Sequence, residues 1–175
     1  EWAPKGVDRF YNLVKVGYFT DIAFFRVIGG FMAQLGMHGD PTINTAWKKS
    51  TIDDDPVRES NKRGYVTFAK TNAPNSRSTQ LFINYQNNTT LDSMQFAPIG
   101  KVVDEPGKGG GMSVIDKLYS EYGEGAPRGR GPSQMKIGMQ GNTYLKSEFP
   151  NLDYVKSAHI CGAGTSPESA KGYCP

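Results

Sequence analysis

The chain has 175 residues and a formal net charge of +3 at pH 7. This length suits one domain with a sizeable core. The Lys and Arg residues are scattered and form no basic stripe, which argues against binding to nucleic acid. No apolar run approaches the about 20 residues that a membrane helix needs, so we expect no insertion into a membrane.

The first 35 residues predict one helix and two strands. Apolar residues recur at helical spacing over residues 5–16, which predicts a short amphipathic helix. Two apolar runs follow at 22–28 and 31–35, separated by Gly29-Gly30. This pattern predicts adjacent strands that are joined by a tight turn.

The polar stretch from 36 to 63 predicts a long loop. It contains three adjacent aspartates at 53–55. Successive side chains of an extended segment point in opposite directions, so these carboxylates are not expected to converge on a cation. We interpret them as part of a solvated loop.

The rest of the chain predicts more strands and a second helix. Further strands are expected at 65–69, 80–85, 96–103 and 154–161. Pro98 lies inside one of them and favours an edge or bulge position. Apolar spacing over 114–122 predicts the second helix, and the Gly- and Pro-containing segment 123–150 is interpreted as an exposed loop.

The two cysteines, Cys161 and Cys174, both lie near the C-terminus. They predict either a disulfide in an oxidising compartment or a buried thiol beside a free one. With only His38 and His159 as histidines, and no CxxC pair, the ligands for a structural zinc site are too few. We therefore expect neither a metal nor a cofactor.

Four segments of the chain carry a family resemblance. They are FFRVIGGFMAQLG at 24–36, RGYVTFA at 63–69, QLFI at 80–83 and LDSMQFAPIGKV at 91–102. In this order they resemble the cyclophilin-type peptidyl-prolyl cis-trans isomerases. The resemblance runs from about Val7 to Cys161.

The resemblance implies a mainly β fold, a closed antiparallel β-barrel capped by two α-helices. Family members usually carry two strands before the first helix, whereas this chain starts at that helix. We expect that upstream residues supply them, and the alternative is a barrel that is open on one side. Residues 1–161 are expected to form the isomerase domain and residues 162–175 a flexible tail.

The resemblance also assigns a site. Arg26 falls on the catalytic arginine of the family, and Gln34 and Phe82 complete the catalytic set. Thr90 stands where cyclosporin-sensitive members have tryptophan, so we expect weak binding of cyclosporin A. Substrate-binding positions are Phe31, Met32, Ala69, Lys70, Gln80, Leu91 and Phe96.

The function implied is acceleration of rotation about X–Pro peptide bonds in protein substrates, which assists folding. As the bond twists, the prolyl nitrogen regains a lone pair, and a guanidinium N–H of Arg26 would stabilise that state. The expected partners are proline-containing polypeptides, and the expected compartment is the periplasm or the exterior. The alternative is a proline-peptide-binding scaffold or a structural subunit of a larger assembly, with little turnover.

Overall fold

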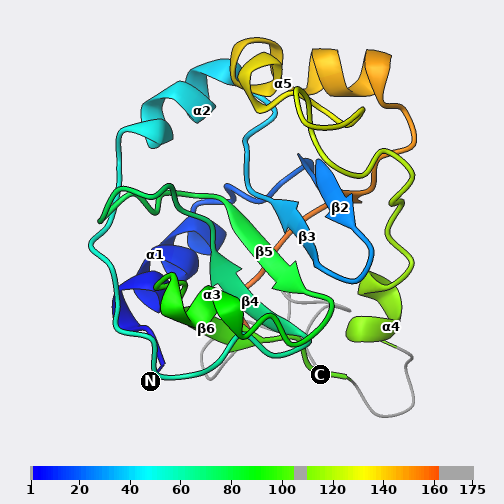
Figure 1. Cartoon of the computed structure of the whole chain (residues 1–175). Helices are drawn as coiled ribbons and strands as arrows, with labels where there is room; N and C mark the ends of the chain where they lie inside the picture. Colours follow the sequence, from blue (N-terminus) through cyan, green and yellow to red (C-terminus); the bar gives the residue numbers. More distant parts are fainter. Residues whose placement is uncertain (1, 105–109, 162–175) are drawn as a thin grey trace.

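A computed structural model describes residues 2–104 and 110–161 of the chain (Figure 1). Cys174 lies outside these residues, so the disulfide to Cys161 stays a prediction, as does the flexibility of the tail. In chain order the elements are α1 (Pro4–Lys15), β1 (Ile22–Ala23), β2 (Arg26–Ile28), β3 (Met32–Leu35), α2 (Pro41–Lys48), β4 (Tyr65–Phe68), β5 (Leu81–Asn84), α3 (Thr90–Ser93), β6 (Pro98–Lys101), α4 (Met112–Ile115), α5 (Gln134–Glu148) and β7 (Tyr154–Val155).

The strands form two antiparallel sheets. The larger sheet has the order β2-β3-β5-β4-β6, and β1 pairs with β7 in a second sheet of two strands. β6 lies at an edge and Pro98 is its first residue, which confirms the position expected for that proline. Within the described ranges these pairings do not close a barrel, so closure stays a prediction.

The two faces of the larger sheet have different chemistry. Figure 1 shows α1 to the left of the sheet, where it is in contact with β6. Leu13 and Val14 of α1 pack in one apolar cluster with Ala33 and Leu35 of β3. The alternating residues Met32 and Gln34 belong to the opposite face. The sheet therefore buries one face against a helix and presents the other to a cavity.

Several predicted boundaries were wrong. The run 22–28 is broken at residues 24 and 25, because β1 and β2 belong to different sheets. The helix expected at 114–122 is limited to the single turn of α4, and the strand expected at 154–161 is limited to β7. The described residues hold five helices where two were expected to cap the fold.

The largest error concerns the segment 123–150, which is not simply an exposed loop. Its second half is α5, where Ser133 caps the N-terminus and Gly141 interrupts the helix. Ile137 and Leu145 of α5 are buried in an apolar cluster with Phe25. Figure 1 shows α5 beside α2 at the top of the molecule, and the two helices are in contact. Long-range burial thus orders a segment whose local pattern is weak.

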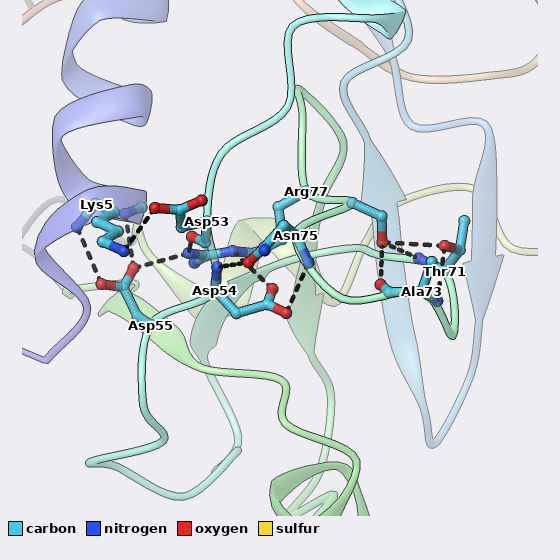
Figure 2. A network of polar contacts seen from close by, with 10 residues as sticks. Lys5, Asp53, Asp54, Asp55, Thr71, Ala73, Asn75 and Arg77 are labelled. Atoms are coloured by element: carbon cyan, nitrogen blue, oxygen red, sulfur yellow. Dashed lines mark hydrogen bonds and ion pairs between the residues drawn. The ribbon is translucent and has the colours of Figure 1, made fainter.

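The three aspartates at 53–55 are a solvated loop only in part, because Asp53 is exposed whereas Asp55 is buried. Figure 2 shows the polar contacts that Asp55 makes. Its carboxylate accepts hydrogen bonds from the backbone N–H groups of Lys5 and Gly6, at 3.1 and 2.9 Å, and so caps α1. Its Oδ2 lies 3.0 Å from Nη2 of Arg77, whose side chain is 2% exposed. This ion pair ties the N-terminus of α1 to the loop that precedes β5.

Two further findings are limited to the same residues. No helix there combines the length and the apolar character that a bilayer span requires. Likewise, no group of three or more His, Cys, Asp or Glu side chains there is placed to hold a metal ion.

Candidate active site

A cavity of about 600 Å³ lies on the face of the sheet opposite α1. All ten residues assigned to the site by resemblance line it, namely Arg26, Phe31, Met32, Gln34, Ala69, Lys70, Gln80, Phe82, Leu91 and Phe96. Six further lining residues were not predicted: Lys48, Thr51, Thr71, Ser76, Ser78 and Gln134. The structure thus brings the predicted residues together around one cavity.

The three residues expected to act in catalysis lie side by side on neighbouring strands. Arg26 of β2 is directly opposite Gln34 of β3, and Gln34 is directly opposite Phe82 of β5. Because directly opposed side chains in an antiparallel sheet point to the same face, all three reach one cavity. The sheet register, rather than a loop, determines their spacing.

A chain of hydrogen bonds runs along one wall of the cavity. Nη1 of Arg26 donates to Oε1 of Gln34 at 3.0 Å, and Nε2 of Gln34 donates to Oε1 of Gln80 at 2.8 Å. Gln80 then donates to Oε1 of Gln134 in α5 at 3.4 Å. Gln34 is buried and its amide is engaged at both ends, so its orientation is set by its neighbours.

Glu124 is a functional candidate that the sequence interpretation missed. Its two carboxylate oxygens accept hydrogen bonds from Nε and Nη2 of Arg26, at 2.7 and 2.6 Å. These hydrogen bonds, and a further one from the backbone N–H of Gly125, hold the pKa of Glu124 below its usual value despite partial burial. The carboxylate is therefore charged at neutral pH. The motif GEGAPRGRG was visible in the sequence, but nothing local linked it to Arg26.

Another part of the cavity wall is apolar. Met32, Phe82 and Leu91 form one buried cluster, against which Phe31 and Phe96 pack. The rings of Phe82 and Phe96 meet edge to face with centroids 5.8 Å apart. This wall offers a rigid apolar surface for a small ring.

Phe31 reaches the cavity from the turn between β2 and β3. Gly30 adopts a φ of 71°, which a residue with a side chain rarely takes. The guanidinium carbon of Arg26 lies 5.9 Å from the centroid of the Phe31 ring. The bend expected at Gly29-Gly30 is thus present, and it brings an aromatic ring beside the cation.

Buried amides support the apolar wall from behind. Nδ2 of Asn88 donates to the carbonyl of Phe31 at 2.8 Å and to Oδ1 of Asn84 at 2.8 Å. Nδ2 of Asn61 donates to the carbonyl of Phe96 at 2.9 Å. Asn61 and Asn84 are fully buried, so these bonds replace lost contacts with water and hold the two loops in place. The sequence offered no signal for this network.

The cavity combines an oriented cationic donor with an apolar ring-sized wall. The other charged residues that line it are Lys48 and Lys70. Nζ of Lys70 lies 5.5 Å from the centroid of the Phe96 ring. Such an arrangement can hold an apolar ring and donate a hydrogen bond to a polar atom beside it.

Comparisons with known proteins agree on one family. The model of the cyclophilin type peptidyl-prolyl cis-trans isomerase/CLD family matches residues 1–138. Peptidyl-prolyl cis-trans isomerase-like 3 of Rhizopus delemar is 34% identical over 129 residues, which cover 67% of this chain and 71% of that protein. The human protein of the same name is 35% identical over 124 residues, covering 67% and 70%.

Solved structures show the same fold. A cyclophilin type peptidyl-prolyl cis-trans isomerase of Cryptosporidium parvum, solved in the presence of the dipeptide Ala-Pro, matches with a TM-score of 0.54 and 22% identity. The match covers 75% of this chain and 79% of that one. At this identity the likeness supports the fold, and the family comes from the sequence matches.

Proposed function

The chain belongs to the cyclophilin-type peptidyl-prolyl cis-trans isomerases, as its sequence predicted, and we propose that the cavity around Arg26 is its active site. There it accelerates rotation about X–Pro bonds in polypeptides. The observation that carries this proposal is the row formed by Arg26, Gln34 and Phe82 across three strands. It places a fixed cation, an amide and an aromatic ring on one surface.

The reaction needs a catalyst that weakens amide conjugation. Rotation about a peptide bond has a barrier of roughly 18–20 kcal/mol, because the nitrogen lone pair is delocalised into the carbonyl. The two isomers of an X–Pro bond are close in energy, yet they exchange over tens to hundreds of seconds. No covalent bond forms or breaks. A group that interacts more strongly with the twisted amide than with the planar one is sufficient.

Arg26 supplies that group in our proposal. The prolyl nitrogen becomes pyramidal as the bond twists, and a guanidinium N–H that points at it stabilises the twisted state. Arginine suits this role because its charge is permanent and its planar fork is rigid. Gln34 holds Nη1 of Arg26 from the next strand. The donor is therefore oriented before the substrate arrives.

The apolar wall binds the proline ring. Phe31, Met32, Phe82 and Leu91 surround the space beside the guanidinium, with Phe96 closing one side. The Cryptosporidium parvum protein was solved in the presence of a proline dipeptide, and proline-containing polypeptides are the substrate class that we propose here. The N–H of Ala69 donates to the carbonyl of Gln80 at 2.9 Å, so we expect the substrate backbone to pair with the Ala69 carbonyl and with Lys70.

Two proposals concern the architecture. Residues 1–161 are proposed to form one isomerase domain, because the apolar clusters of the described residues lie on the two faces of one sheet and beside it. The sheets are also proposed to belong to one closed barrel. β2 and β6 are the outer strands of the larger sheet. Closure of the barrel would pair the backbone N–H and C=O groups at their outer edges and so remove an edge that is prone to aggregation.

The test is a protease-coupled exchange assay on a short prolyl peptide. An isomerase increases the rate of cis–trans exchange in proportion to its concentration. The Arg26→Ala protein should lose this acceleration while its circular dichroism spectrum is unchanged. A wild-type protein that binds the peptide without any acceleration would instead be a proline-binding scaffold. Equal rates for the wild type and Arg26→Ala would remove Arg26 from the mechanism.

A further inference from the structure

We propose that Glu124 is a positioning residue that holds the guanidinium of Arg26 in the orientation that the isomerase reaction uses, an inference that rests on the proposed function of the cavity. The two residues lie 98 positions apart in the sequence. Glu124 does not line the cavity, so it acts on the reaction through Arg26.

Three hydrogen bonds to oxygen restrain the guanidinium from two sides, beside a longer contact of 4.0 Å from Nη1 to Sδ of Met32. Glu124 accepts hydrogen bonds from Nε and Nη2 of Arg26, at 2.7 and 2.6 Å, and Oε1 of Gln34 accepts one from Nη1 at 3.0 Å. A bidentate pair with a carboxylate defines the plane of the guanidinium as well as its position. Without Glu124, only Nη1 would be held, by Gln34 and by the sulfur of Met32, and the guanidinium could rotate about that nitrogen. The pair with Glu124 removes that freedom.

The loop that carries Glu124 is built to hold its carboxylate. The backbone N–H of Gly125 donates to Oε1 of Glu124 at 2.8 Å, and the N–H of Gly131 donates to the Glu124 carbonyl at 2.8 Å. At Gly129 a Cβ atom would lie only 2.3 Å from that carbonyl oxygen. Glycine at this position is therefore needed for the loop to close around Glu124. The carboxylate is preorganised before Arg26 meets it.

Geometry, rather than neutralisation of charge, is the main consequence of this contact. The side chains of Arg26 and Glu124 are 23% and 35% exposed, so solvent screens their mutual attraction. Hydrogen-bond direction is not screened in this way. Catalysis by a single donor depends on its alignment with the prolyl nitrogen, and small misplacements of a reacting group are costly.

The decisive variant is Glu124→Gln, which keeps the size of the side chain. Its amide oxygen can still accept from the N–H of Gly125, so its NH₂ group takes the place of Oε2 and cannot accept the hydrogen bond from Nη2 of Arg26. We expect kcat/KM for a prolyl peptide to fall on the order of 10- to 100-fold, with the loss in kcat and little change in KM. Glu121→Gln is the matched control, because Glu121 is an exposed carboxylate just before the same loop. It should leave both constants unchanged. An unchanged or faster Glu124→Gln enzyme would overturn the proposal.

A double-mutant cycle separates positioning from a structural role. In the Arg26→Ala background, Glu124→Gln should cause no further loss of the residual rate, because its target is already gone. An equal loss in both backgrounds would mean that Glu124 only maintains the loop, and it would overturn the proposal.

A spectroscopic measurement keeps the inference testable if the proposed function fails. In the wild type, the Arg26 Nε–H resonance should exchange slowly with water, and Glu124→Gln should accelerate that exchange at least tenfold. Absence of turnover in the wild type would reject the proposed function and, with it, a role for Glu124 in the reaction. The exchange rate would still report the contact. Equal exchange in both proteins would show that Glu124 does not restrain Arg26.

Discussion

Nη1 of Arg26 donates a hydrogen bond of 3.0 Å to Oε1 of Gln34, which lies directly opposite it on the neighbouring strand. This bond makes the oxygen of the Gln34 amide face Arg26 and the nitrogen face Gln80. Any change at either residue therefore affects the orientation of the other. The pair is the centre of the proposed site.

Arg26→Ala should reduce kcat/KM for prolyl peptides on the order of 100-fold or more, since the variant loses a preorganised donor to the twisted amide. Exchange kinetics and circular dichroism on the same sample check this. Arg130→Ala, which removes an exposed arginine, is the control and should keep the wild-type rate. A folded Arg26→Ala protein with full activity contradicts the mechanism.

The cations around the cavity should favour acidic substrates. The charge of Arg26 is offset by Glu124, and Lys48 and Lys70 are the other charged residues that line the cavity. A peptide with Glu before proline should therefore be turned over faster than one with Lys. Exposed charge pairs contribute about 0.2–1 kcal/mol, which corresponds to at most roughly fivefold. Lys70→Glu should narrow or reverse the preference. Equal kcat/KM values for the two peptides at low salt would reject this expectation.

Arg77→Met should destabilise the fold by about 3–5 kcal/mol, because it leaves the buried carboxylate of Asp55 without its cation (Figure 2). Urea unfolding measures the change. Lys5→Ala breaks a pair with Asp53 in which both side chains are more than half exposed, and it should cost less than about 1 kcal/mol. Similar losses for the two variants would show that burial of the Arg77 pair has little effect on stability.

The free energy of unfolding should decrease at alkaline pH because Tyr85 loses its proton. Burial, followed by the nearby charge of Asp116, raises the pKa of Tyr85 from 10.0 to about 12. Its hydroxyl donates to the carbonyl of Ile115 at 2.8 Å, which also favours the protonated form. The folded state therefore holds this proton more tightly. The contribution of the protonated Tyr85 to the free energy of unfolding is complete below pH 10 and is lost as the pH rises towards 12.

Unfolding of the wild type and of Tyr85→Phe at several pH values between 9 and 12 checks this. The phenylalanine variant should show a weaker decline of the free energy of unfolding over that window. Parallel declines in the two proteins would assign the alkaline sensitivity to other groups.

Cyclosporin A should bind weakly to the wild type and more tightly to Thr90→Trp. Thr90 is exposed at the start of α3, one residue before Leu91 of the cavity wall. A tryptophan there would add a broad ring face and an indole N–H donor. Calorimetric titration of both proteins tests this. Tight binding by the wild type would show that position 90 does not control the drug.

The sequence by itself was sufficient where structure follows from local pattern. Alternation along 31–35 assigned Met32 and Gln34 to one face, and the structure confirms it, since Ala33 and Leu35 pack against α1. Helical spacing predicted α1 to within one residue at each end. The motif order was enough to identify the family. These features depend on the spacing of neighbouring residues or on the order of motifs along the chain. They can therefore be recognised without knowing which distant segments are in contact.

Only the tertiary structure decided the status of Asp55, α5 and Glu124. Asp55 is buried because a cation 22 positions away offsets its charge. The helix α5 contains Gly138 and Gly141, which lower its intrinsic propensity, and packing stabilises it instead. Glu124 meets Arg26 because a loop and a strand that are far apart in sequence approach in space. Such contacts depend on burial and three-dimensional register, and neither quantity is encoded in the spacing of neighbouring residues.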